Sequence, residues 1–221
     1  IRDANVKARK IMVVEKAVAD GLGMGIDVKN SQGVIVVNVG FETTEISILS
    51  LGGIVLSRLI KVGGVKFDEA IRSAIRREFS LIIGGKTAES VKMSLSKLEE
   101  EKQGAVVYGR DIVTGLPVER EIPTKLVVDS LEEHFNTIVD NVKVILERTP
   151  PELAADIYRN GVYLTGGASQ TSHLAERLSQ GTGLKVNVSE NPMTSVAVGL
   201  SKIINEDNYK TVAYAIEGMS K

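Results

Sequence analysis

The sequence predicts an α/β fold in which helices cover both faces of one sheet and a small α+β unit is inserted near residues 84–123. Continuous apolar runs such as VIVVNV at 34–39 are typical of strands that are buried on both faces of a sheet. Segments with the helical spacing of apolar residues alternate with such runs, which favours an α/β architecture over an all-α or all-β one. The alternation is interrupted once, by a helix and a short strand pair, and this interruption indicates the insertion.

The first part of the chain contains four predicted strands. The runs IMVV at 11–14 and VIVVNV at 34–39 are continuous and apolar, so we expect both to be buried strands. Residues 44–51 alternate between apolar and polar side chains, Gly52 and Gly53 turn the chain, and residues 54–62 return. This pattern predicts a tight β-hairpin.

Two predicted helices and a strand pair follow. Residues 66–79 have the spacing of an amphipathic helix, with acidic residues in the first turn and basic residues near the end, as the helix dipole favours. Its expected apolar face consists of Phe67, Ala70, Ile71, Ala74, Ile75 and Phe79. In the insertion, residues 87–102 predict a helix that ends before Gly104, and AVVYG at 105–109 and VEREI at 118–122 predict a short strand pair.

The last part of the chain repeats a strand–turn–helix order. Residues 126–148 predict a long helix, which Pro150 and Pro151 end. GVYLTGGA at 161–168 predicts a strand that meets a glycine pair and leads into a helix at 169–180, and LKVNVS at 184–189 predicts another strand. Asn191 and Pro192 are expected to cap the last helix, with the proline near its first position.

Composition excludes several classes of protein. The 221 residues are 43% hydrophobic and 25% charged, as in soluble globular proteins, and the net charge of −1 offers no bulk attraction for nucleic acid or anionic membranes. Cysteine is absent and the two histidines fall in different helical patterns, so we expect no metal site built from these residues. The longest apolar runs are far shorter than a membrane span. Because the chain begins at Ile1 and not at methionine, we expect it to be part of a longer protein.

Two glycine-rich stretches fail the nucleotide-binding motifs that they suggest. GGKT at 84–87 lacks the first glycine of a P-loop, because Ser80 stands five residues before Gly85. GLGMG at 21–25 lacks the dinucleotide-binding spacing, because Ile26 stands at the last glycine position. This second stretch is better explained as the end of a helix.

The stretches LTGGA at 164–168 and NVGFETT at 38–44 are more informative, since each places glycine at the end of a strand. Two glycines before a helix allow a ligand to approach the backbone, and a helix N-terminus attracts negative charge, but a tight structural turn explains LTGGA equally well. The turn at 38–44 could hold a phosphate, yet it carries Phe41 and Glu42 where such a loop would have glycines. The residues alone leave open a nucleotide site, an altered one and a plain hairpin.

These two strand–turn elements and the insertion between them resemble the MreB family of bacterial actins, within the superfamily of actin, Hsp70 and sugar kinases. The stretches that carry the resemblance are ISILSLGGIVLSRLIKVGGVKFDEAI at 46–71, IGGKTAESVK at 83–92, YGRDIVTGLP at 108–117, ERTPPELAADIYRNGVYLTGGA at 147–168 and NPMTSVAVG at 191–199. YGRDIVTGLP and TPPELAADI are specific to MreB-type proteins. The resemblance covers the chain up to about residue 205 and implies a divergent member of the family, of which this chain is the second lobe.

The fold that the resemblance implies is an actin-like (ribonuclease H-like) α/β subdomain with a small α+β insertion subdomain. Residues 1–83 and 124–190 would form the larger subdomain of the second lobe, and residues 84–123 the small inserted one. Residues 191–221 would form a C-terminal helix that returns toward the first lobe, followed by a tail. The tail at 206–221 resembles the family only weakly, and we assign it no role.

The resemblance also implies a nucleotide site in which several positions match the family. The matching residues are Gly40, Thr43 and Thr44 in the second phosphate loop, Glu89 and Lys92 on the insertion helix beside the adenosine, and Gly166 and Gly167 after the late strand. Glu89 and Lys92 also have the spacing of an ordinary surface ion pair on a helix.

Other positions depart from the family. Where the family has D-I-G-G-G-T-T, residues 38–44 read NVGFETT, so that Asn38 replaces the aspartate that helps to organise metal and water. Two glycines are replaced by Phe41 and Glu42. Where the family has E-E-P-x-A-A-A-I-G, residues 15–23 read EKAVADGLG, and Lys16 replaces the glutamate that positions the attacking water. The resemblance therefore implies no catalytic residue and no metal ligand in this chain.

These departures predict weaker phosphate binding and weak or lost hydrolysis. A carboxylate about 4 Å from a phosphate charge costs about 4 kcal/mol at an effective dielectric constant of about 20. Lys16 removes the acceptor for the proton of the attacking water. We hypothesise that Lys16 and Glu42 pair across the site. In the alternative, Lys16 compensates phosphate charge, so that binding is kept while hydrolysis is lost.

The function that the resemblance implies is cytoskeletal: forming or joining filaments for cell shape, wall synthesis or motility. ATP or ADP with Mg²⁺ would bind weakly, or no cofactor would bind at all. The partner would be a second copy or another MreB-like protein and not nucleic acid, in the cytoplasm or at the inner face of the cell membrane, with membrane contact only through segments outside this chain. An active ATPase filament protein of the ordinary type and a non-polymerising regulatory partner of another MreB stay open as alternatives.

Overall fold

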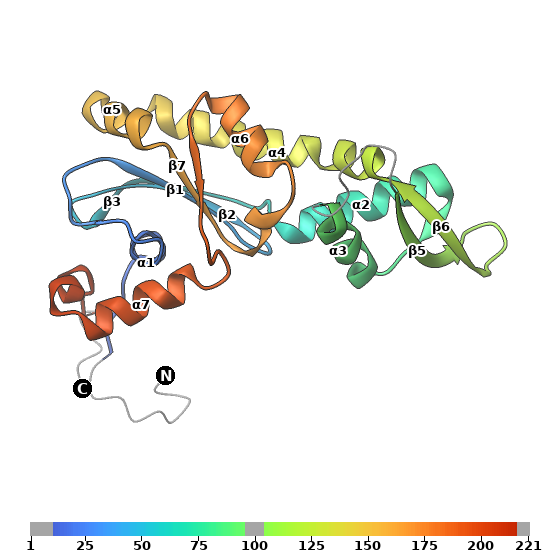
Figure 1. Cartoon of the computed structure of the whole chain (residues 1–221), viewed down its shortest axis with the longest axis horizontal. Coiled ribbons are helices and arrows are strands. Elements are labelled where there is room, and N and C mark those ends of the chain that lie inside the picture. The colour runs from blue at the N-terminus through green and yellow to red at the C-terminus, as the bar shows by residue number, and fades with distance from the viewer. Residues whose placement is uncertain (1–10, 96–103, 216–221) are drawn as a thin grey trace.

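Two sheets organise the structure, a computed structural model that describes residues 11–95 and 104–215 (Figure 1). The larger sheet has the strand order β3-β2-β1-β7-β8 and consists of β1 (Val34–Val39), β2 (Thr44–Ser50), β3 (Gly53–Ile60), β7 (Val162–Thr165) and β8 (Val186–Val188). The smaller sheet has the order β4-β5-β6 and consists of β4 (Leu81–Ile82), β5 (Gly104–Asp111) and β6 (Pro117–Pro123). The smaller sheet lies at the far end of an elongated molecule from β3 and α5.

Helices cover both faces of the larger sheet, as the sequence predicts. On one face lie α1 (Lys16–Gly23) and α7 (Ser195–Asn205), and on the other lie α4 (Thr124–Glu147), α5 (Pro151–Asn160) and α6 (Leu174–Thr182). The helix α2 (Gly64–Phe79) leads from β3 of the larger sheet to β4 of the smaller one, and α3 (Gly85–Ser94) lies between β4 and β5 in the chain. Two short 3-10 helices, η2 (Gly167–Gln170) and η3 (Asp207–Val212), complete the described elements.

The central strand β1 explains why the two faces bury different residues. All six of its residues are buried, which confirms the prediction of a strand covered on both faces. Val34 and Val36 belong to the cluster that packs under α1 and α7, whereas Ile35 and Val37 belong to the cluster on the other face. By this alternation Asn38 points toward α1.

The main core is continuous between the two sheets. Buried residues of β1 and β2 share one cluster with Val107 of β5, Ile122 of β6 and the inner face of α4, which runs past both sheets. Phe67 of α2 and Phe135 of α4 meet edge to face inside it, with ring centroids 5.4 Å apart. The small sheet is therefore fixed to the large one by apolar packing.

The predicted buried strand at 11–14 is wrong. Val13 forms only an isolated antiparallel bridge with Tyr214, and Met12 is exposed. Both edges of β1 are already occupied by β2 and β7, so the run has no place beside it. Tyr214, in the tail to which the sequence assigns no role, pairs with it instead.

Several helix boundaries also differ from the predictions. The predicted helix at 169–180 is split into η2 and α6, because His173 takes a left-handed conformation with φ of 70°. The last helix begins at Ser195, after a turn whose Pro192 carbonyl accepts a hydrogen bond from Gly166 N. The helix α2 begins at Gly64, before the predicted start, so its acidic residues fall outside the first turn. The predicted continuation of α3 to residue 102 lies outside the described residues, and α5 was not predicted.

Candidate functional site

The turn that joins β1 to β2 is held by its own backbone and by α2. Gly40 N donates to Thr43 O at 2.9 Å, which closes the turn. Gly40 O accepts from Gly64 N at 3.0 Å and Phe41 O accepts from Val65 N at 2.8 Å, so that the first turn of α2 fixes the two carbonyls. Thr44 is fully buried and donates through Oγ1 to Val62 O. Three of the predicted loop residues, Gly40, Thr43 and Thr44, therefore shape the turn.

The glycine pair after β7 lies against the same edge of the sheet. Gly166 has φ of +92°, and a Cβ built on it would lie 2.3 Å from Val39 O, so that a larger residue would push β7 away from β1. Its N–H donates to Pro192 O at 3.0 Å. Since β1 and β7 are parallel neighbours, their ends place the Gly40 turn and the Gly166 turn side by side.

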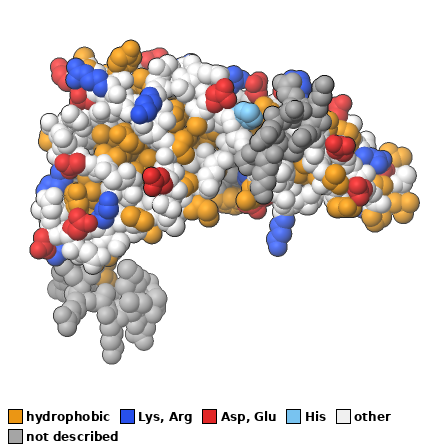
Figure 2. All heavy atoms as spheres, in the orientation of Figure 1, with side chains coloured by type: hydrophobic (Ala, Val, Ile, Leu, Met, Phe, Trp, Pro, Cys, Tyr) orange, Lys and Arg blue, Asp and Glu red, His pale blue; other side chains and the backbone are white. Residues whose placement is uncertain are grey.

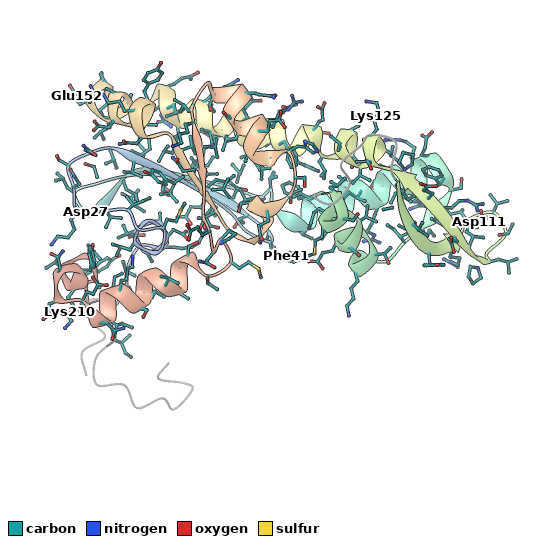
Figure 3. All side chains as sticks on the ribbon, in the orientation of Figure 1. Asp27, Phe41, Asp111, Lys125, Glu152 and Lys210 are labelled. Atoms are coloured by element: carbon teal, nitrogen blue, oxygen red, sulfur yellow. The ribbon has the colours of Figure 1, made fainter. Side chains whose placement is uncertain are left out.

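A cavity of about 420 Å³ opens next to these two turns. Four of the predicted site residues line it: Phe41, Glu89, Lys92 and Gly167. Met93 and Met193 add apolar surface, and the volume lies in the range of small-molecule sites. Phe41, which is 64% exposed, lies at the junction of the larger sheet with α2 and α3 (Figure 3).

The charge of Lys92 is compensated inside this cavity. Its Nζ lies 2.8 Å from Asp68 Oδ1, and the two side chains are only 10% and 13% exposed. The alternative of a surface pair between Glu89 and Lys92 is therefore wrong, because the lysine turns toward α2. A Cβ built on Gly64 would lie 3.6 Å from Phe41 Cδ2 and 3.7 Å from Lys92 Nζ, so ring and ammonium both lie over Gly64. The sequence analysis did not assign Asp68 to the site. The feature that could have indicated it is its position next to Phe67, on the inner side of a predicted helix.

On the opposite side of β1, Lys16 has a different partner from the one hypothesised. Its Nζ lies 2.9 Å from Glu45 Oε2. The hypothesis of a Lys16–Glu42 pair is wrong, because Glu45 of β2 points toward α1 while Glu42 is exposed in the turn. Glu45 is the strand partner of Asn38, so the Lys16–Glu45 pair lies directly beside the end of β1.

Asn38 is itself bonded to a buried carboxylate. Asn38 Nδ2 donates to Asp20 Oδ2 at 2.7 Å. Asp20 is fully buried, and burial raises the pKa of its carboxyl to about 6; Glu45 acts in the same direction, while the Asn38 hydrogen bond and Lys16 oppose it. Asp20 was also missed by sequence reasoning. The feature that could have indicated it is that Asp20 is the one acidic residue in AVADGLG, a stretch of small and apolar residues.

Two buried hydroxyls complete this polar cluster. Thr165 of β7 is the strand partner of Asn38 on the other side, and its Oγ1 is hydrogen-bonded to Ser195 Oγ at the start of α7. Both residues are buried. The end of β1 is thus surrounded by polar side chains from α1, β2, β7 and α7.

The two sides of the site differ in how well they fit a nucleotide with Mg²⁺. The cavity beside Glu89 and Gly167 has room for a nucleoside. The turn side offers an exposed phenyl ring and an exposed carboxylate, a poor setting for phosphate. Within the described residues no three acidic or histidine side chains gather as a metal site.

No helix in the described part of the chain combines the length and the apolar composition needed to cross a bilayer. Exposed apolar side chains occur at several places on the face shown in Figure 2. One group of them lies at the β5–β6 end of the molecule, where Tyr108, Val113 and Leu116 are exposed.

Comparisons with known proteins agree on one family. A family described as "MreB/Mbl protein" matches residues 2–212. The cell shape-determining protein MreB of Escherichia coli (strain K12) is 37% identical over 199 residues, which are 89% of this chain and 57% of that protein. The cell shape-determining protein Mbl of Bacillus subtilis (strain 168) is 36% identical over 209 residues, which are 93% of this chain and 63% of that protein. This chain therefore spans about six tenths of the length of these relatives.

A solved structure confirms the predicted actin-like fold. The crystal structure of MreB5 of Spiroplasma citri bound to ADP superposes with a TM-score of 0.87 at 37% sequence identity, over 95% of this chain and 64% of that one. The match of the family to residues 2–212, the identities and the shared fold lead to one conclusion. The chain belongs to the MreB/Mbl protein family.

Proposed function

We propose that this protein is a divergent MreB-type cytoskeletal protein that forms or joins filaments, binds adenine nucleotide weakly and hydrolyses it slowly or not at all. Nucleotide binding is supported by the cavity beside Glu89 and Gly167 and by the ADP in the Spiroplasma citri relative. The function in cell shape is supported by the two curated relatives. The protein acts in the cytoplasm or at the inner face of the cell membrane, with a second copy or another MreB-like protein as its partner.

One observation carries the proposal of weak hydrolysis. Lys16, at the position where the family has its water-positioning glutamate, is ion-paired with Glu45 beside Asn38. A lysine cannot accept the proton of an attacking water, and Asn38 supplies no negative charge to organise a metal ion. The two positions that would drive hydrolysis are thus replaced together.

The division into subdomains is part of the same proposal. Residues 1–83 and 124–190 form the larger subdomain, residues 84–123 the small one, and residues 191–221 the returning helix with the tail. Strands β5 and β6 of the small sheet fall within residues 84–123, which supports this division, whereas their neighbour β4 (Leu81–Ile82) ends just before its first residue.

Phosphate release and sedimentation of the full-length protein test the proposed function. With ATP and Mg²⁺ we expect filaments, alone or together with an orthodox MreB, and phosphate release at the background rate. Robust release coupled to assembly would instead identify an ordinary ATPase filament protein. Sedimentation only together with that partner would indicate a regulatory or capping subunit, and failure to sediment in either case would exclude filament formation.

Replacing Glu42 by glycine is expected to raise the affinity for ATP about five- to tenfold. The carboxylate is exposed, so water and salt screen its repulsion of phosphate and the gain stays below that of a buried charge. Titration of ATP into the wild-type and Glu42→Gly proteins measures it. The Glu42→Gln variant keeps the side-chain size, so an equal gain there assigns the effect to charge. Unchanged affinity in both would remove Glu42 from the site.

A further inference from the structure

One buried carboxylate has no role in the function proposed above. Asp20 lies in α1 on the side that faces the sheet, beside Ala17, Val18 and Leu22, and is 0% exposed. Among the buried side-chain oxygens and nitrogens of the described residues, its Oδ1 is the one that lacks a hydrogen-bond partner. A buried carboxylate that is incompletely hydrogen-bonded destabilises a fold. The aspartate at position 20 is therefore better explained by a functional role than by a contribution to stability.

The contact of Asp20 determines how the Asn38 amide is turned. An ionised carboxylate only accepts hydrogen bonds, so the amide directs its nitrogen to Asp20, with Nδ2 at 2.7 Å from Oδ2. The amide oxygen must then point the other way. Asn38 Oδ1 lies 3.9 Å from a Cβ built on Gly40, so it faces the turn at 40–43.

We propose that Asp20 is a positioning residue, which holds the Asn38 amide so that Oδ1 faces the Gly40 turn. This inference rests on the proposed function, in which that turn faces a nucleotide. The end of β1 then offers a hydrogen-bond acceptor to the ligand. An acceptor favours a water molecule or a hydrated cation and disfavours a bare phosphate oxygen, which requires donors. Asp20 thereby lowers the affinity for the phosphates of the nucleotide without touching them.

The groups around Asp20 and its burial determine the pH at which its carboxyl loses its proton. Lys16 of α1 and Glu45 of β2 act on it electrostatically. Next to Asn38, β7 and α7 contribute the hydroxyls of Thr165 and Ser195, while Lys202 of α7 donates to Leu22 O, further along α1. Burial raises the pKa of the carboxyl to about 6, so it can be protonated under mild conditions. A protonated carboxyl can also donate, and it then no longer forces one orientation on the amide.

The affinity of the full-length protein for ADP, measured without divalent cations between pH 5.5 and pH 8, tests the inference. At pH 8 we expect the Asp20→Asn variant to bind at least about fivefold more tightly than the wild type, and at pH 5.5 about equally, because the carboxyl is then protonated in the wild type. The ratio at each pH cancels the titration of ADP itself. A ratio that does not change with pH would overturn the inference, and the exposed Asp27 provides a control in the variant Asp27→Asn.

A double-mutant cycle separates positioning from direct repulsion by the charge of Asp20. In the Asn38→Ala background, Asp20→Asn should change ADP affinity by less than about twofold, because the amide that transmits the effect is gone. A fivefold gain in that background would show that the charge acts directly, and the positioning role would be lost.

A measurement on the ligand-free protein tests this inference independently of the proposed nucleotide binding. In the ligand-free protein, the NMR signals of the Asn38 side-chain amide should shift with a midpoint near the carboxyl pKa of about 6 and should stay constant in Asp20→Asn. Signals that do not titrate in the wild type would overturn the positioning role. If they titrate while no variant binds ADP at either pH, Asp20 positions the amide and the nucleotide function is what fails.

Discussion

Replacing Gly199 by alanine should lower the free energy of unfolding by about 2 kcal/mol, because steric overpacking of about 3 kcal/mol outweighs a gain of about 1 kcal/mol in helix propensity. Gly199 of α7 crosses α1 so closely that an added Cβ would lie 1.8 Å from Ala19 O and 2.6 Å from its carbonyl carbon. The crossing is close from both sides, since a Cβ on Gly23 of α1 would lie 1.9 Å from Ser195 O. The clash is with backbone, which cannot turn away as a flexible side chain can. Denaturant unfolding followed by circular dichroism measures the loss.

Gly53→Ala is the matched control for this prediction. A Cβ built there meets nothing within 4 Å, so its midpoint of unfolding should stay close to that of the wild type. Equal midpoints for Gly199→Ala and Gly53→Ala would mean that α7 can move away from α1 at little cost. In that case the close crossing would not be a requirement of the fold.

Replacing Asp20 by asparagine should raise the free energy of unfolding at pH 8 by up to about 3 kcal/mol. Folding raises the pKa of this carboxyl from 3.8 to about 6, and each pKa unit corresponds to about 1.4 kcal/mol. Because the folded-state pKa is the higher one, the favourable contribution is fully present below pH 3.8 and is lost as the pH rises through about 6. The asparagine side chain stays neutral and can still accept from Asn38 Nδ2.

Urea unfolding of wild type and Asp20→Asn between pH 4 and pH 8 measures this effect. The wild type should lose stability relative to the variant across the range from about pH 4 to pH 7, and the two should differ little at pH 4. The variant Asp27→Asn, which changes an exposed carboxylate, should run parallel to the wild type. Parallel curves for Asp20→Asn as well would mean that Asp20 is not desolvated in the folded protein.

Much of the fold could be predicted from local patterns. The run VIVVNV predicts a strand buried on both faces, and the structure buries every residue of β1. The hairpin at Gly52 and Gly53 follows from turn chemistry, and the long helix α4 from its apolar spacing. The run at 11–14 was misjudged because its pattern is the same as that of a central strand, and only the neighbours of β1 decide whether a place remains. The break at His173 depends on a left-handed backbone angle that its residue type does not predict.

The residues of the candidate site could be proposed from the sequence, but their pairings could not. Resemblance to a family located Lys16, Asn38 and Phe41, whereas their partners depend on which strand face each side chain occupies. Glu45 lies three residues from Glu42, yet it points toward α1 and binds Lys16. Likewise Asp68 and Lys92 are 24 residues apart in sequence and meet only because α2 and α3 pack together. Such pairs arise from tertiary packing, which periodicity does not encode.

The shared core along α4 has a mechanical consequence. With 24 residues this helix is about 36 Å long, and its inner face packs against buried residues of both sheets. Because one rigid helix packs against both sheets, a displacement of the β5–β6 hairpin is transmitted through α4 to the large sheet. We therefore expect the two sheets to rotate together as one rigid unit. A partner that binds the hairpin would then also change the orientation of the Gly40 turn.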